Sequence, residues 1–181
     1  NLYIGSNTSV KVGGTRVSVE TATDYPWDGN ISISINPRRS KTFGVKLRIP
    51  GWCEEYEIAV NGENVDTSVS DGYAVIERKW KKGDRISLKL DMESKMVAAD
   101  PRVKADEGRR AIQRGPVVYC LEETDNPNIS DAVLDTSTTL ETRFEPTLLG
   151  GVCTITANQT EGKLTFIPYY AWDNREPGKM A

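Results

Sequence analysis

Apolar and polar residues alternate with a period of two along most of the first half of the chain. Residues 15–22, TRVSVETA, and residues 30–37, NISISINP, each place their valines or isoleucines on one face. This pattern predicts half-buried antiparallel strands. The alternation continues, with turn signals in between, through further segments at residues 43–51, 56–65, 72–80 and 84–92.

The turns between these segments have sequences that suit tight reversals. Asn61-Gly62 tolerates the positive φ of a type I′ hairpin, Pro50-Gly51 ends a strand, and Lys81-Lys82-Gly83 makes a short connection. No stretch keeps a helical stripe of apolar residues for three turns. Short strands at roughly ten-residue spacing are typical of a β-sandwich.

The rhythm breaks after Leu90, which suggests a domain boundary near residues 100–107. Beyond it, strands are predicted at residues 109–115, 116–123, 150–158 and 163–172, with a long loop at 124–147. A strand at 95–98 is a further expectation. We therefore predict an all-β protein with two antiparallel β-sandwich, jelly-roll-like modules in tandem, residues 1–103 and 104–181.

Composition removes several classes of function. The net charge is −3 and the basic residues are scattered, which argues against nucleic acid as a partner. No run of 18 apolar residues is present, so we expect no membrane-spanning segment. The sequence contains no histidine, which excludes Ser-His-Asp and Cys-His catalysis and His-based zinc sites within this chain.

Three cysteines, Cys53, Cys120 and Cys153, are far apart, and the last two lie in apolar strand patterns. A zinc site built on cysteines normally draws two ligands from closely spaced positions. We therefore interpret them as core thiols and expect no metal or other cofactor in this chain.

The loop DYPWDG is a candidate sugar-binding or interdomain surface. Tyr25 and Trp27 offer ring faces on which a sugar can stack, and Asp24 and Asp28 flank them. The alternative is a tight turn, fixed by Pro26 and Gly29, that closes the end of the sandwich.

The C-terminal stretch is the second candidate. Clustered aromatic residues at an exposed chain end are unfavourable unless another surface covers them. The alternative is that they close the second core. The residues concerned are Tyr169, Tyr170, Trp172, Asp173 and Arg175.

Adjacent carboxylates occur at Glu54-Glu55, Asp106-Glu107 and Glu122-Glu123. A glycosidase sets two carboxylates about 5 to 9 Å apart across a cleft. Neighbours on a strand point to opposite faces, so we interpret these pairs as solvated turns.

Five blocks in order resemble the C-terminal half of glycoside hydrolase family 127, the DUF1680 proteins, which include β-L-arabinofuranosidases. They cover essentially the whole chain and are NLYIGS, TDYPWDG, LRIPGWC, AIQRGPVVYCLE and IPYYAWDNREPGKMA. The resemblance implies that an (α/α)6 barrel precedes this region and holds the active site, with a cysteine nucleophile and a zinc bound by cysteines and a glutamate. None of those catalytic residues has a counterpart here.

The resemblance also implies two β-sandwich modules that pack on the barrel, the second making dimer contacts in some members. Since family members continue past Ala181, we expect the second module to be truncated. The leading hypothesis is therefore a non-catalytic accessory region of a family 127-like glycoside hydrolase that docks on the catalytic barrel. A carbohydrate-binding module that uses exposed aromatic residues is the alternative, and the compartment stays open between the cytoplasm and the periplasm or exterior.

Overall fold

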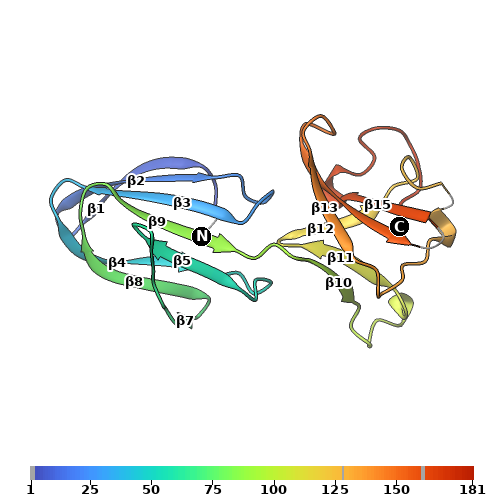
Figure 1. Ribbon diagram of the computed structural model, residues 1–181, viewed down its shortest axis with the longest axis horizontal. Helices are drawn as coiled ribbons and strands as arrows, with labels where there is room; N and C mark the ends of the chain where they lie inside the picture. Colours follow the sequence, from blue (N-terminus) through green and yellow to red (C-terminus); the bar gives the residue numbers. More distant parts are fainter. Residues whose placement is uncertain (1–2, 128, 160–161) are drawn as a thin grey trace. The chain divides into compact units, whose positions relative to one another are not determined.

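The computed structural model describes residues 3–127, 129–159 and 162–181. The chain divides into two compact units, Asn1–Met92 and Glu93–Ala181, which are described separately as unit 1 and unit 2. Strands dominate both (Figure 1). In the described part of the chain, the helical segments are three short 3-10 turns, at Lys104–Asp106, Ile129–Asp131 and Tyr169–Ala171. None of them is long and apolar enough to cross a membrane.

Unit 1 consists of two antiparallel sheets. The larger sheet has six strands in the order β1 (Ser6–Val12), β2 (Thr15–Thr23), β3 (Asn30–Pro37), β9 (Asp84–Leu90), β5 (Tyr56–Val60) and β6 (Glu63–Asn64). The smaller has three, in the order β4 (Lys41–Arg48), β8 (Tyr73–Trp80) and β7 (Val69–Ser70).

The core of unit 1 follows from the period-two alternation. On β9 every second residue is buried, and on β3 the three isoleucines are buried while the serines between them are partly exposed. Trp80 of β8 is fully buried, and its indole Nε1 donates a hydrogen bond to the carbonyl oxygen of Phe43 at 2.9 Å. The polar N–H group of this indole ring thus has a hydrogen-bond partner although the ring lies in the core.

Unit 2 is a single six-stranded antiparallel sheet. Its strands follow the order β10 (Ser94–Ala98), β11 (Arg110–Arg114), β12 (Val117–Leu121), β15 (Gly162–Pro168), β14 (Val152–Gln159) and β13 (Leu140–Glu145). The sheet curls until its two edges approach, because the hydroxyl groups of Ser94 on β10 and Thr142 on β13 lie 2.9 Å apart. Its core includes Ile112, Tyr119, Ile155 and Phe166.

The all-β class and the two antiparallel modules in tandem are confirmed. Among the described residues, three strands lie where none was predicted. β1 occupies the N-terminal segment, the two-residue β7 lies just before β8, and β13 lies inside the segment predicted as a long loop. The division after Met92 lies ahead of the predicted boundary at 103/104. The physical reason is that β10 pairs with β11 along its whole length, so residues 94–98 belong to unit 2.

Candidate functional site

The loop between β2 and β3 carries Tyr25 and Trp27, both half-buried. The ring of Tyr25 packs edge-on against Tyr3 with the ring centres 6.0 Å apart, and burial raises the pKa of both phenols. The Trp27 backbone N–H donates to the carbonyl of Asp24 at 2.8 Å, which closes a tight turn. The ring of Tyr25 therefore packs at the margin of the hydrophobic core of unit 1.

The two aspartates of this loop have different surroundings. An Asp28 carboxylate oxygen accepts the backbone N–H of Asn30 at 2.8 Å, so this side chain shapes the loop. The side chain of Asp24 is exposed. The backbone of the loop is held against β9, since the Leu90 N–H donates to the Gly29 carbonyl at 2.9 Å. This loop is an end cap of unit 1, held by these hydrogen bonds, that leaves part of Trp27 accessible.

In unit 2, Tyr169 and Tyr170 begin the C-terminal segment and are 52% and 59% exposed. Both lie in the 3-10 turn that follows β15, and this turn ends at Ala171, which is buried. The half-buried Trp172 comes next, and its indole Nε1 is buried without a hydrogen-bond partner among the described residues. The two tyrosines thus form an exposed aromatic pair, whereas Trp172 turns inward.

Among the residues of unit 2 whose burial the structure describes, Glu122 is the most buried charged one, at 1% exposure. One of its carboxylate oxygens accepts the backbone N–H of Asp173 at 3.0 Å, and the other accepts Nε of Arg175 at 2.9 Å. Arg175 also pairs with Asp125, and this hydrogen bond raises the pKa of the guanidinium further above its usual value. Arg175 and Asp173 are therefore part of an internal network.

The interpretation of Glu122-Glu123 as a solvated turn was wrong for Glu122. A carboxylate that directly follows an apolar strand can turn inward when a guanidinium from elsewhere in the chain neutralises it. That partner, Arg175, is 53 residues further along the chain, so neighbouring sequence carries no sign of the pair. The sequence shows that the C-terminal segment contains an arginine, but it does not show which acidic residue this arginine pairs with.

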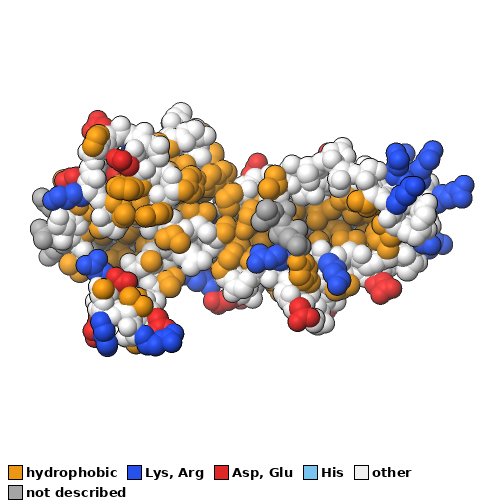
Figure 2. Space-filling model, turned by 180° about the vertical axis from the view of Figure 1, so that it is seen from behind, with side chains coloured by type: hydrophobic (Ala, Val, Ile, Leu, Met, Phe, Trp, Pro, Cys, Tyr) orange, Lys and Arg blue, Asp and Glu red, His pale blue; other side chains and the backbone are white. Residues whose placement is uncertain are grey.

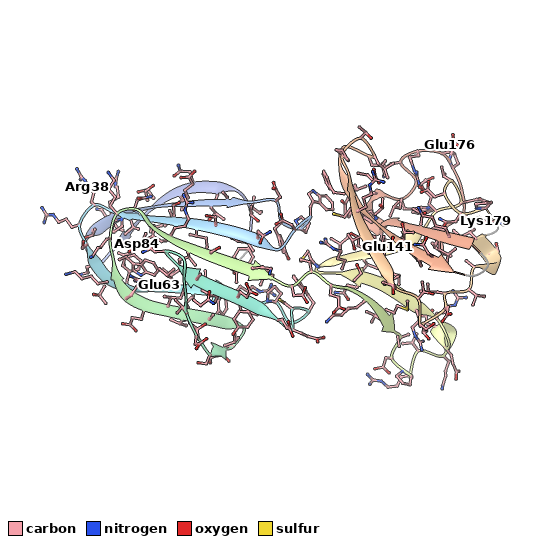
Figure 3. The ribbon with its side chains drawn as sticks, viewed as in Figure 1. Arg38, Glu63, Asp84, Glu141, Glu176 and Lys179 are labelled. Atoms are coloured by element: carbon pink, nitrogen blue, oxygen red, sulfur yellow. The ribbon has the colours of Figure 1, made fainter. Side chains whose placement is uncertain are left out.

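The chain end is also bonded to this region. The backbone of Ala181 exchanges two hydrogen bonds with Leu121, and the Lys179 N–H donates to a carboxylate oxygen of Glu123 at 2.9 Å. Figure 3 labels Glu176 and Lys179 in this segment of unit 2. The segment 173–181 thus folds back onto the end of β12, where Arg175 anchors it.

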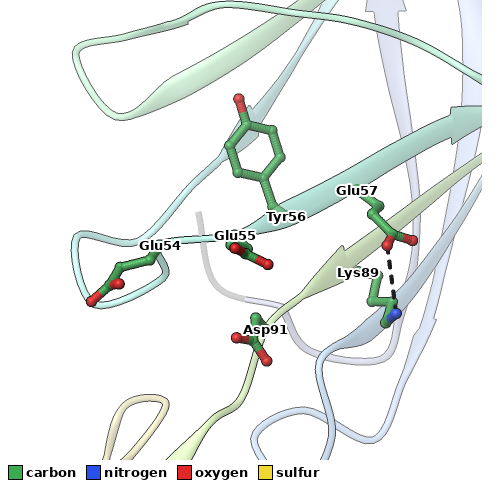
Figure 4. Close-up of a pocket in the computed structure, with 6 residues that line it drawn as sticks. All are labelled: Glu54, Glu55, Tyr56, Glu57, Lys89 and Asp91. Carbon is green, nitrogen blue, oxygen red and sulfur yellow. Dashed lines mark ion pairs between the residues drawn. The ribbon is translucent and has the colours of Figure 1, made fainter.

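A cavity of about 480 Å³ lies at one end of unit 1, lined by Glu54, Glu55, Tyr56, Glu57, Lys89 and Asp91. In Figure 4, Glu57 faces Lys89, with which it forms an ion pair at 3.7 Å, while Glu55 and Asp91 lie close together and Glu54 points away. All four acids are exposed to solvent. A general acid of a glycosidase needs an environment that favours its protonated form, which open solvent does not supply.

The three cysteines are free thiols. Burial raises the pKa of Cys120 to about 11, which disfavours the thiolate that a metal would need. The Sγ of Cys53, in unit 1, donates to the Glu55 carbonyl oxygen at 3.0 Å. Among the described residues, no three Cys, Asp or Glu side chains gather in a way that could hold a metal ion. The described residues of this chain therefore do not offer the set of ligands that a zinc ion requires.

The structure thus separates the candidate residues into two groups. Tyr25 and Trp27 belong to unit 1, and the remaining candidates belong to the C-terminal segment of unit 2. In that segment Tyr169 and Tyr170 are presented to solvent, whereas Asp173 and Arg175 bind Glu122.

Comparison with protein families matches the two units to two consecutive domains. Residues 1–92 match the family model of the middle domain of family 127 β-L-arabinofuranosidases, and residues 94–181 match that of the C-terminal domain of glycoside hydrolase family 127. These limits coincide with the division of the structure after Met92.

Individual proteins give the same result. A non-reducing end β-L-arabinofuranosidase of Bifidobacterium longum subsp. longum is 34% identical over 91% of this chain, which corresponds to 30% of the relative's length. A family 127 β-L-arabinofuranosidase crystal structure from Geobacillus stearothermophilus T6 matches with a TM-score of 0.94 and 39% identity, over 99% of this chain and 32% of its own. Another family 127 β-arabinofuranosidase gives 0.91 and 37%, over 99% and 33%. The chain therefore spans about a third of the length of these relatives.

Proposed function

Since the chain belongs to glycoside hydrolase family 127, we propose that it is the non-catalytic accessory region of a larger arabinofuranosidase-type hydrolase. In this role its two β units support a catalytic domain and provide the surface on which that domain packs. The function is structural, and the chemistry belongs to the remainder of the enzyme.

One observation carries this proposal. The middle-domain and C-terminal-domain models account for almost every residue of the chain, yet the chain covers only 30% to 33% of the length of three relatives. The greater part of each relative therefore has no counterpart among these 181 residues.

An uncovered part of the larger sheet of unit 1 is the docking face that we propose. Three strands cannot cover six, and Val10 of β1 is 46% exposed although it lies directly opposite Val17, which is 1% exposed. Residues directly opposite in an antiparallel pair point to the same face. Val10 therefore lies on the core face of the sheet at a place that the smaller sheet leaves open, and Figure 2 shows hydrophobic side chains exposed on unit 1.

A chimera tests the proposal. In the Geobacillus stearothermophilus enzyme, this chain replaces the matching 32% of the protein, and arabinofuranosidase activity and thermal stability are measured. We expect the chimera to be active and more stable than the enzyme without this region, while the 181-residue chain alone gives no turnover of aryl β-L-arabinofuranosides.

Two matched variants of the chimera locate the docking face. Val10→Asp puts a charge on the uncovered core face, and we expect it to weaken docking by about 2 kcal/mol because a carboxylate would be desolvated there. Val75→Asp is the control, since Val75 is similarly exposed at 42% but lies on β8 between the buried residues Ala74 and Ile76 and so faces outward. Turnover by the chain alone, or equal effects of the two variants, would contradict the proposal.

Three expectations stay predictions. They are the homodimer, the binding of carbohydrate by Tyr25 and Trp27, and a contact of Tyr169 and Tyr170 with another protein surface. The exposure of the tyrosine pair supports the last of these, because two exposed neighbouring aromatic side chains are more often found where a second surface covers them.

A further inference from the structure

One end of unit 1 collects basic side chains from three different turns. Arg16 follows the turn between β1 and β2. Arg38 and Arg39 lie in the turn between β3 and β4, and Lys41 begins β4 directly after it. Lys81 and Lys82 lie between β8 and β9. We call these six residues the basic end. All six are exposed, and none forms an ion pair within the described part of the chain. Figure 2 shows Lys and Arg side chains gathered at this end of unit 1.

The antiparallel topology of unit 1 places these three turns at the same end of the unit. Alternate connections of the sheet lie at the same end, and hydrogen bonds hold the turns together. The Arg38 N–H donates to the Arg16 carbonyl at 2.8 Å, and the Gly83 N–H donates to the side-chain oxygen of Asn36 at 3.0 Å. Lys41 lies close over the first turn, because a Cβ added at Gly13 would be 2.8 Å from its Cε. The cations therefore sit on a preformed surface.

Asp84 is the acid nearest to these turns along the chain, and it is used internally. It is 8% exposed, and its carboxylate accepts the Lys81 backbone N–H at 2.8 Å and the Asn61 side-chain amide at 3.0 Å. These hydrogen bonds lower its pKa. Figure 3 labels Arg38, Asp84 and the exposed Glu63 at this end. Asp84 thus organises the turn without pairing with the outer ammonium and guanidinium groups.

The opposite end of unit 1 has the reverse charge. The loop after β2 contributes Asp24, and the cavity lined by Glu54, Glu55 and Asp91 lies where β5 begins and β9 ends. Positive and negative side chains are thus separated along the strands of one small unit. Such separation creates a local positive potential in a chain whose net charge is −3.

We propose that the basic end binds an acidic polysaccharide, a polymer of sugar units that carry carboxylates. Cations spread over three turns suit a ligand with a repeating charge, and arginine matches the geometry of a carboxylate. This binding is separate from the proposed docking role, and it holds the enzyme near a carboxylated matrix.

Other polyanions fit the turns less well. Gly13, Gly14, Ser40 and Gly83 are the other residues at the turns, so no aromatic ring is offered for stacking on a nucleic acid base. The same residues offer no large apolar side chain that could enter a lipid headgroup layer.

The test is binding of the 181-residue chain to sodium polygalacturonate, measured by affinity electrophoresis at low and at high salt. Each exposed cation contributes little alone and is screened by salt, so we expect saturable retardation at about 20 mM NaCl that is largely lost at about 300 mM. Fully methyl-esterified polygalacturonate has the same sugar backbone without the charge and should not retard the chain.

Two variants with equal charge change separate the surface from net charge. Arg38→Gln/Arg39→Gln/Lys81→Gln/Lys82→Gln should weaken binding about 10-fold or more, since four contacts with the polyanion are lost. The control Lys46→Gln/Lys104→Gln/Arg109→Gln/Lys163→Gln changes four exposed cations elsewhere and should stay within about twofold, because binding depends on the local field.

Several outcomes would overturn the inference. They are equal weakening by the two variants, retardation by the esterified polymer, or tighter binding to duplex DNA or phosphatidylserine vesicles at equal charge concentration. The comparison of the two polygalacturonates needs no variant and no turnover, so its result does not depend on the docking proposal.

Discussion

Glu122 shows how a single residue determines the path of the C-terminal segment. Its carboxylate is almost completely removed from water, yet it accepts hydrogen bonds from the Asp173 backbone and the Arg175 guanidinium. A buried charge without its partner is strongly destabilising, whereas a neutral side chain of similar shape is tolerated. The main effect of the Glu122–Arg175 pair is therefore to fix the position of residues 173–181. Its net contribution to the stability of the fold is smaller.

Arg175→Met should destabilise unit 2 by about 3 kcal/mol, because Glu122 would stay buried and lose its guanidinium. We choose the lower end of the usual range because the Arg175 side chain is 20% exposed. Native-state hydrogen exchange of the β12 amides measures the effect. The double variant Glu122→Gln/Arg175→Met is the control, since glutamine still accepts the Asp173 N–H without a charge. It should cost less than the single variant, and an equal or larger cost would contradict the buried-charge explanation.

At the scale of elements, a strand can be predicted from the sequence when one of its faces is buried and the other is exposed. β3 and β9 were predicted because their alternate residues enter the core and so must be apolar. β1 and β13 are edge strands with almost every residue partly or fully exposed, so no alternation marks them. The same reasoning explains the site: the aromatic loops were visible in the sequence, but the long-range Glu122–Arg175 pair was not.

The loop between β2 and β3 gives a sharp test at this scale. A Cβ at Gly29 would lie 1.9 Å from the Leu90 carbonyl oxygen, so Gly29→Ala must push the loop away from β9 and break the hydrogen bond between Leu90 and Gly29. We expect a loss of about 2 kcal/mol in the stability of unit 1. Urea unfolding followed by tryptophan fluorescence reports it, because Trp27, Trp52 and Trp80 lie in this unit.

Gly51→Ala is the matched control for this substitution. Gly51 lies in another loop of unit 1, has no neighbour within 4 Å of an added Cβ, and has no positive φ. Its replacement should change stability by less than about 0.5 kcal/mol. If both alanine variants behave alike, the close approach of the loop to β9 is not what requires glycine.

At the scale of the whole molecule, the position of the boundary decides whether each part can fold by itself. Unit 1 has its own core between two sheets, and unit 2 has its own core inside one curled sheet. Each part is in the size range of small domains that fold independently. Residues 93–103 are the critical segment, because β10 pairs with β11 and Met96 packs against the second core.

Two cuts of the chain therefore have different results. A cut after Met92 should give two folded pieces, each with a dispersed amide spectrum and cooperative unfolding. A cut at residue 103, the boundary that the broken alternation predicts, should leave 104–181 without an edge strand and with Ser94 no longer bridging to Thr142. We expect 93–181 to fold and 104–181 to be largely unfolded or aggregated, since an open β11 edge is unprotected.

The pieces 1–92 and 1–103 serve as the control and should be equally stable, because residues 93–103 contribute nothing to the core of unit 1. Equal folding of 93–181 and 104–181 would mean that β10 is not an integral strand of unit 2.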